Sequence, residues 1–130
     1  MNNALRDYKI VIGALCASFE RQLSVYTELR DAARSSLSKL VLSRGDAGVL
    51  VAGVEKKARL LEQIDKERAG IAEQIEYWQE NRQNLAHDRD AASLNEILAR
   101  TETVIKEFLA EEEKLRQYVE KIFKHAEPKE

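Results

Sequence analysis

The chain has 130 residues, of which 34% are charged and 6% aromatic, and its formal net charge is −2. This length fits one domain over residues 1–130, and the near-neutral charge gives no reason to expect a nucleic acid as partner. The single cysteine, Cys16, cannot form an internal disulfide, which suits a reducing compartment. No apolar run approaches the roughly 20 residues of a membrane span, so membrane insertion is not expected.

A first helix is predicted over residues 3–43. One stripe of mainly apolar positions steps by four and three residues, the spacing of one helical face; its members are Tyr8, Ile12, Leu15, Phe19, Gln22, Tyr26, Leu29, Ala33, Ser36 and Leu40. Gly45 can take the left-handed conformation that ends helices, so the helix should stop near Ser43.

The apolar residues 10–19 also resemble a secretion signal, because Arg6 and Lys9 precede them. A lipoprotein signal needs a small residue before its cysteine, whereas Leu15 precedes Cys16 here. The helical spacing also runs straight through this stretch, so a helix is the preferred interpretation.

A second helix is predicted over residues 47–86, with Asp46 as its N-cap. Its seam again alternates four and three residues, through Leu50, Val54, Lys57, Leu61, Ile64, Arg68, Ile71, Ile75, Trp78, Arg82 and Leu85. Because only two to four residues connect the first two predicted helices, these helices should be antiparallel neighbours.

A third helix is predicted over residues 91–125, after a loop at residues 86–90. Ser93 and Glu96 have capping-box spacing, and Asp90 is a rival cap. The predicted seam of this helix is Leu94, Leu98, Thr101, Ile105, Phe108, Glu112, Leu115, Val119 and Ile122.

Three helices of nearly equal length with short loops predict an all-α fold, an elongated antiparallel three-helix bundle or coiled coil. The alternative is an open hairpin that completes its core as a homodimer, because long thin bundles bury few residues per turn.

Polar residues interrupt these seams. Folding the predicted helices back on one another places Arg68 near Gln22 and within a turn of Glu112. A polar layer of these three residues would fix the register of the helices. In the alternative interpretation, the long side chains reach out to the rim of the bundle.

Residues that could carry catalysis are sparse, so an enzyme is not expected. His87 and His125 lie far apart in the sequence, and no zinc-binding cluster or glycine-rich phosphate loop is present, so no metal or other cofactor is predicted. Cys16 lies in an apolar stretch, where a packed thiol is commoner than a nucleophile. The acidic run at residues 111–113 is interpreted as a solvated helix face.

Residues 46–68 resemble the FlgN family of flagellar type III export chaperones. The resemblance rests on an aspartate at the first turn and on a lysine, two leucines and an arginine in a fixed rhythm, which here are Asp46, Lys57, Leu60, Leu61 and Arg68. Family members also resemble this chain in length and in their long antiparallel helices.

The resemblance implies a cytoplasmic chaperone that binds hook-associated subunits, those of the hook–filament junction, before type III export. It implies the export apparatus as a second partner and requires no nucleotide or metal. Two alternatives stay open: a structural or adaptor coiled coil acting through helix–helix contacts, and a regulatory helical protein acting on a secretion ATPase.

A client-binding surface is predicted at the end of the third helix. The apolar stripe there is wider than one seam requires, through Leu115, Tyr118, Val119, Ile122 and Phe123. In the alternative interpretation, Tyr118 and Phe123 merely cap the open end of the bundle core.

Overall fold

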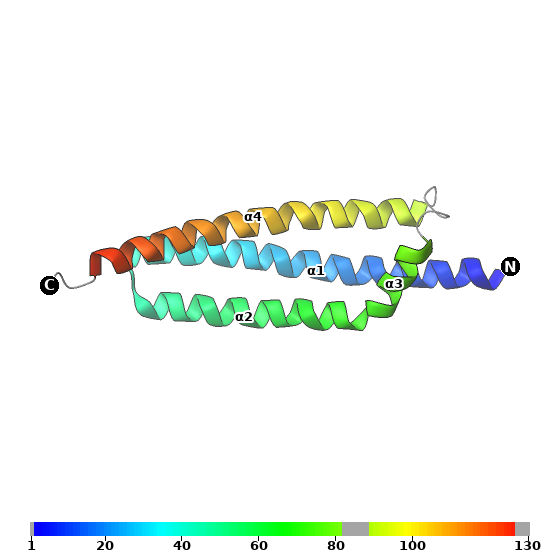
Figure 1. Cartoon of the computed structure of the whole chain (residues 1–130), viewed down its shortest axis with the longest axis horizontal. Coiled ribbons are helices and arrows are strands. Elements are labelled where there is room, and N and C mark those ends of the chain that lie inside the picture. Colours follow the sequence, from blue (N-terminus) through cyan, green and yellow to red (C-terminus); the bar gives the residue numbers. More distant parts are fainter. Residues whose placement is uncertain (1, 82–88, 127–130) are drawn as a thin grey trace.

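The computed structural model describes residues 2–81 and 89–126 and forms an elongated bundle of helices (Figure 1). The helices are α1 (Asn2–Ser43), α2 (Ala47–Gly70), α3 (Ala72–Asn81) and α4 (Arg89–Ala126). No strand occurs in the described residues, which confirms the predicted all-α helical bundle. Arg82, Leu85 and His87 lie outside the described residues, as does most of the predicted second loop.

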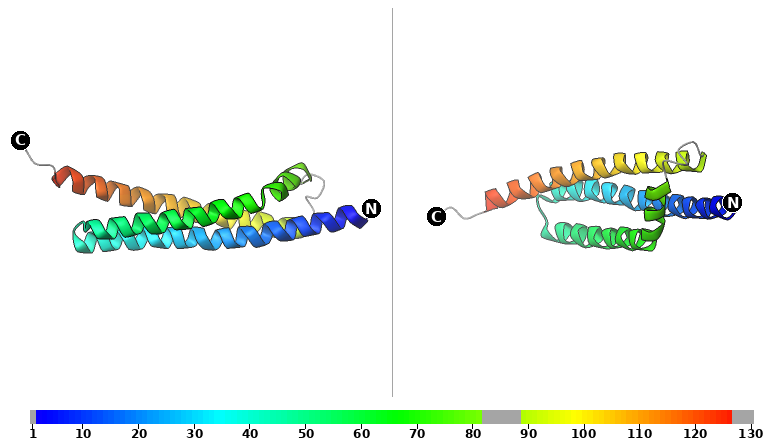
Figure 2. Two further views of the ribbon diagram at one scale, coloured as in Figure 1. Left: turned by 90° about the horizontal axis from the view of Figure 1, so that it is seen from below. Right: turned by 45° about the vertical axis from the view of Figure 1, so that its right-hand side comes forward.

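Helix α1 is the centre of the bundle, and α2 and α4 each pack along it (Figures 1 and 2). Ion pairs join Arg30 to Glu107 and Arg34 to Glu111, so α1 and α4 run parallel. Helix α2 runs back from the first turn and is antiparallel to both. The predicted up-down-up order of the three long segments is therefore present.

The predicted stripe of α1 faces the core along its length. Tyr8, Ile12, Leu15, Leu29 and Leu40 are almost wholly buried. They belong to two apolar regions. The first, near the α1 N-terminus, comprises Tyr8, Ile12, Leu15, Ile71 and Leu94. The second, in the middle of the bundle, comprises Tyr26, Leu29, Ala33, Leu60, Ile64 and Phe108.

The turn between α1 and α2 has the predicted capping residues. Arg44 and Gly45 both have positive φ, 57° and 92°. The Gly45 N–H donates to Leu40 O at 2.8 Å and the Arg44 N–H to Val41 O at 3.3 Å, the paired bonds of a Schellman cap. The Asp46 side chain then accepts from the Gly48 N–H at 2.8 Å and caps α2.

The prediction of one continuous helix over residues 47–86 was wrong. Helix α2 ends at Gly70 and α3 begins at Ala72. Ile71 leaves helical geometry at φ −119° and ψ 15°, while its side chain is buried in the first apolar region. Helix α3 then crosses α1 from the α2 side to the α4 side (Figure 2). Burial of Ile71 against α1, next to a glycine that weakens the helix, explains the break.

Helix α4 begins at Arg89, two residues before the predicted start at Ala91. Ser93 therefore lies inside the helix, where its hydroxyl donates to Arg89 O at 3.3 Å, and the prediction of Ser93 as the cap was wrong. At its other end, α4 extends past the α1–α2 turn (Figure 1). None of the helices in the described ranges has an apolar stretch long enough to cross a membrane.

Candidate interaction face

Helix α2 buries only part of its predicted seam: it buries Ile64 but not Val54 or Leu61, and it buries Leu60, which lies outside the seam. Leu60 and Ile64 are 5% and 2% exposed, whereas the seam residues Val54 and Leu61 are 56% and 38% exposed. Leu60 turns toward α1, and Leu61, one position further around the helix, turns toward the α4 side. These two consecutive leucines therefore lie on different faces of α2, and only the face of Leu60 is covered by α1.

The exposed seam residues face a gap between α2 and α4. No Cα atom of α2 lies within 8 Å of a Cα atom of α4, although both helices approach α1 that closely. Helices in direct contact have axes about 8–10 Å apart, so the α2–α4 pair is not closed along its length. The two helices meet only through side chains, since Leu60 and Ile64 share an apolar cluster with Phe108.

An ion pair bridges this gap. Lys57 Nζ of α2 lies 3.1 Å from Glu112 Oε1 of α4. Both side chains line a narrow cleft whose wall and floor residues come from α1, α2 and α4: Leu29, Ala32, Ala33, Ser36, Leu50, Gly53, Val54, Lys57, Glu112 and Leu115. The cleft therefore lies between α1, α2 and α4 and contains the Lys57–Glu112 ion pair.

Apolar side chains flank the Lys57–Glu112 pair on both helices. On α2, Val54 and Leu61 lie three and four residues from Lys57, so they share its side of the helix. On α4, Leu109 lies three residues before Glu112 and is 58% exposed. We call these residues, with Leu50 and Ile105 beside them, the open face. Val54, Leu61 and Leu109 of this face are exposed, whereas Leu50 and Ile105 are half-buried.

The predicted client-binding residues fall into two groups. The Tyr118 hydroxyl donates to Leu40 O at 3.4 Å, and Ile122 packs against the turn, where a Cβ on Gly45 would lie 3.0 Å from its Cδ1. Leu115 and Val119 are half-buried, and Leu115 lines the cleft. Phe123 is 61% exposed. Most of this set therefore holds α4 on the turn, and Phe123 is the member left free to meet a partner.

The predicted polar layer of Gln22, Arg68 and Glu112 forms only in part: Arg68 lies within about one turn of Gln22, as predicted, but Glu112 lies elsewhere. Glu112 pairs with Lys57, eleven residues before Arg68, which at 1.5 Å per residue is about 16 Å along α2. Arg68 instead donates to the Tyr26 hydroxyl at 3.4 Å. The prediction assumed a straight second helix, whereas α2 ends at Gly70 and α3 begins at Ala72.

Gln22 takes part in a different polar cluster. Its amide donates to Ser18 Oγ at 3.3 Å, and the Ser18 hydroxyl donates to Glu67 Oε2 at 2.8 Å. Arg21 Nε also donates to Glu67, at 2.6 Å. The hydrogen bonds from Arg21 and Ser18 hold the pKa of Glu67 below its ordinary value. The partner of this cluster on α2 is therefore Glu67, the residue before Arg68.

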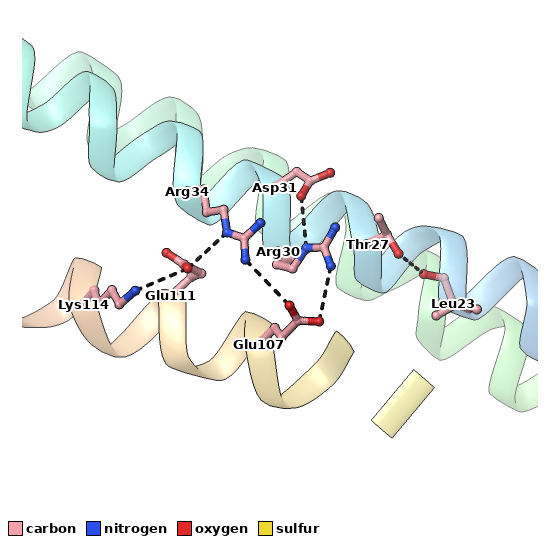
Figure 3. A network of polar contacts seen from close by, with 8 residues as sticks. All are labelled: Leu23, Thr27, Arg30, Asp31, Arg34, Glu107, Glu111 and Lys114. Carbon is pink, nitrogen blue, oxygen red and sulfur yellow. Dashed lines mark hydrogen bonds and ion pairs between the residues drawn. The ribbon is translucent and has the colours of Figure 1, made fainter. Parts of the chain in front are cut away.

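The acidic run at residues 111–113 is only in part the solvated face that was predicted, because Glu113 is exposed, Glu112 is half-buried and Glu111 is buried. Glu111 is buried beside Arg34 at 3.1 Å and also pairs with Lys114 at 3.5 Å (Figure 3). The hydrogen bond from Arg34 is the main cause that lowers the pKa of Glu111. Arg30 and Arg34 both reach Glu107 as well, at 3.4 and 3.8 Å. These pairs join α4 to α1 on the side away from α2.

Groups for catalysis are few in the part of the chain that the structure describes. No cluster of three or more His, Cys, Asp or Glu residues there could hold a metal ion. The Cys16 thiol packs against the first apolar region. Burial, with smaller effects from Glu20 and Asp90, raises the pKa of this thiol, which disfavours the reactive thiolate.

Comparison with known proteins gives no match: no family model, no curated protein and no solved structure is similar to this chain.

Proposed function

We propose that the chain is a chaperone of type III export, which holds an amphipathic helix of a flagellar hook–filament junction subunit on its open face. It does so in the cytoplasm, before the subunit reaches the export apparatus. The observation that carries the proposal is the set of exposed apolar side chains, Val54 and Leu61 on α2 and Leu109 on α4, that flank the Lys57–Glu112 ion pair.

The open face has the chemistry that an amphipathic helix needs. Val54 and Leu61 on one side and Leu109 on the other offer apolar contacts to a helix lying between α2 and α4. Covering such side chains stabilises a complex by about 25 cal/mol for each Å² of apolar surface removed from water. Recognition of this kind places a helix in a groove and reads its apolar positions at helical spacing.

The residues that carry the family resemblance support the same face. Asp46 caps the helix that forms one side of it, and Lys57 and Leu61 point into it. Leu60 anchors that helix on α1, and Arg68 lies one helical repeat beyond Leu61. Asp46 and Leu60 thus stabilise α2 and its packing on α1, whereas Lys57 and Leu61 lie beside the gap between α2 and α4.

The proposal is tested by titrating the chain with a synthetic peptide of the terminal amphipathic helix of a junction subunit, followed by calorimetry. Leu61→Glu and Leu109→Glu should each weaken binding by about tenfold or more, because each buries a charge in an apolar contact. Ile10→Glu is the control, since Ile10, at 63%, is about as exposed as Leu109 at 58% but lies on α1 near its N-terminus. Equal binding by all variants, or no binding by the wild-type chain, would refute the proposal.

A further inference from the structure

The two ends of the bundle differ in charge. The α1–α2 turn and the C-terminal part of α4 lie at one end, and α3 lies at the other with the first turns of α1 and α4 (Figure 1). Residues 37–55 and 114–124, at the turn end, contain six lysines and arginines and three acidic residues. Residues 2–17, 70–81 and 89–97, at the opposite end, contain three basic and six acidic residues. In these ranges the turn end is therefore net positive and the opposite end is net negative.

Basic side chains at the turn end are open to solvent. Four exposed basic residues there form no ion pair with any other residue in the described ranges: Lys39, Arg44, Lys121 and Lys124. Two of the acidic residues beside them are already engaged, because Glu120 pairs with Arg116 at 2.8 Å and the Asp46 side chain caps α2. The positive charge of this end is thus presented to solvent.

The turn end also carries apolar side chains in water. Leu42 is 84% exposed, the highest value among the exposed large apolar residues of the described ranges, and Phe123 is 61% exposed. The Arg34–Glu111 ion pair sets the register of α1 and α4, so Leu42 stands level with Val119. Phe123 lies four residues further, about 6 Å along the bundle axis. We call Leu42, Phe123 and the four exposed basic residues the turn tip.

Leu42 and Phe123 point away from the bundle in different directions. Leu42 is two residues from the buried Leu40, about 200° around α1, so it lies on the solvent side of that helix. Phe123 belongs to α4 and follows Ile122, which packs on the turn. A partner helix lying along one side of the bundle would cover one of these two side chains. A broad, deformable surface that meets the end of the bundle covers both.

An anionic phospholipid bilayer matches the turn tip in charge and in polarity. Its phosphate groups attract lysine and arginine, each of which strengthens binding by about fivefold near such a surface. Leucine and phenylalanine are stabilised at the boundary between headgroups and acyl chains. A nucleic acid or an acidic peptide would use the basic residues but would leave Leu42 and Phe123 in water. The same bilayer repels the acidic opposite end, which orients the chain.

We propose that the chain docks end-on on an anionic phospholipid bilayer through the turn tip. Leu42 and Phe123 enter the headgroup region, the four basic residues lie over lipid phosphates, and the acidic end points away from the membrane. The contact is peripheral, because only side chains enter the bilayer. It leaves the open face uncovered, since that face lies along the side of the bundle. This inference goes beyond the proposed function and does not depend on it.

The apolar contribution is tested by sedimentation of the full chain with vesicles. Vesicles of equal parts phosphatidylglycerol and phosphatidylcholine should bind the chain, and vesicles of phosphatidylcholine alone should bind it far more weakly. Leu42→Ser and Phe123→Ser should each weaken binding to the mixed vesicles by about tenfold, because less apolar surface leaves water. Ile10→Ser is the matched control, since Ile10 is 63% exposed but lies at the opposite end.

The charge contribution is tested with the same mixed vesicles. Lys121→Gln combined with Lys124→Gln should weaken binding by about 25-fold, at about fivefold for each charge removed. Lys66→Gln combined with Lys106→Gln removes the same charge from the middle of α2 and α4, where these side chains are 77% and 73% exposed. These control sites lie beyond a Debye length from the turn tip, so their removal should weaken binding by less than about threefold.

The orientation is tested with a dye whose fluorescence shifts to the blue when it leaves water. The dye is attached to Leu42→Cys or to Ile10→Cys, each in a Cys16→Ala background, since Cys16 is the only natural cysteine. Addition of the mixed vesicles should shift the dye at residue 42 and leave the dye at residue 10 unchanged. Equal shifts at both positions would mean that the chain lies flat on the membrane and would overturn the end-on arrangement.

Two further results would overturn the proposal. Absence of binding to the mixed vesicles, or equal binding to both kinds of vesicle, would mean that the turn tip does not recognise an anionic bilayer. Wild-type binding by both Leu42→Ser and Phe123→Ser would mean that charge alone acts, as for a nucleic acid or an acidic protein. Circular dichroism of each variant checks that the helices are intact. The peptide titration of the proposed function is made without lipid, so the two proposals can fail separately.

Discussion

Lys57 of α2 and Glu112 of α4 form a 3.1 Å ion pair across a gap that the backbones of these helices do not close. The pair sets the register of the two outer helices of the bundle. It lies among the apolar side chains of the open face, and the side chains of Lys57 and Glu112 are 41% and 22% exposed. The same two residues thus hold the cleft together and form the polar centre of the surface proposed to bind helices.

Removal of the charge at Glu112 should lower stability only modestly. Partly exposed ion pairs contribute roughly 0.2–1 kcal/mol, so Glu112→Gln should reduce the free energy of unfolding by about that amount. Urea denaturation in low and high salt measures the effect, which should shrink in high salt. Glu62→Gln is the control, because Glu62 pairs with Lys66 on the solvent side of α2. A loss above about 3 kcal/mol would show that the pair is effectively buried.

Two glycines should respond to alanine in opposite directions. A Cβ on Gly13 would meet nothing within 4 Å, so Gly13→Ala should stabilise the chain by roughly 0.5–1 kcal/mol through helix propensity. Gly45 has φ +92°, and its Cβ would lie 3.0 Å from Ile122 Cδ1, so Gly45→Ala should destabilise the chain by roughly 1–3 kcal/mol. Thermal unfolding of both variants gives the comparison. A neutral Gly45→Ala would argue against the observed turn.

Deletion of the chain after Glu113 should weaken the fold. The deleted segment carries the Tyr118 hydrogen bond to Leu40 O and the contact of Ile122 with the turn, with Leu115 and Val119 half-buried beside them. Half-burial of these apolar side chains implies a loss of roughly 3–5 kcal/mol, measured by circular dichroism in urea. Phe123→Ala is the matched control and should change stability by less than about 0.5 kcal/mol, because Phe123 is exposed. A truncated chain of wild-type stability would assign the end of α4 to binding alone.

Acid should weaken the α1–α2 contact through Glu67. The pKa of this carboxyl is lowered in the folded chain from an ordinary value of 4.5, mainly by Arg21 and then by Ser18. The folded state therefore binds this proton more weakly than the unfolded state. The stabilisation is fully present above about pH 5 and is lost as the pH falls through the folded-state pKa. The wild type should thus exceed Glu67→Gln in stability at about pH 6, and the difference should shrink toward pH 3. A constant difference would contradict the role of the charge.

The sequence by itself determined that the chain is helical and which face of α1 is buried. Spacings of four and three residues identify that face because residues so spaced share one side of a helix. The positions of Gly45 and Asp46 predicted the first turn because their backbone and capping preferences act locally. These features depend on residues near one another in the chain, so a single sequence contains them.

Only the tertiary structure decided which apolar side chains of α2 are covered by α1 and where the helix breaks. Leu60 and Leu61 have equal propensity and hydrophobicity, and the packing of α2 on α1 buries one of them. The break at Ile71 comes from burial against the first apolar region, which overrides a seam that continues without interruption. The packing also decides that Glu112 meets Lys57, while Arg68 donates to Tyr26. The open face follows from the same packing, since α1 can bury one side of α2 and one side of α4 but cannot also close the gap between them.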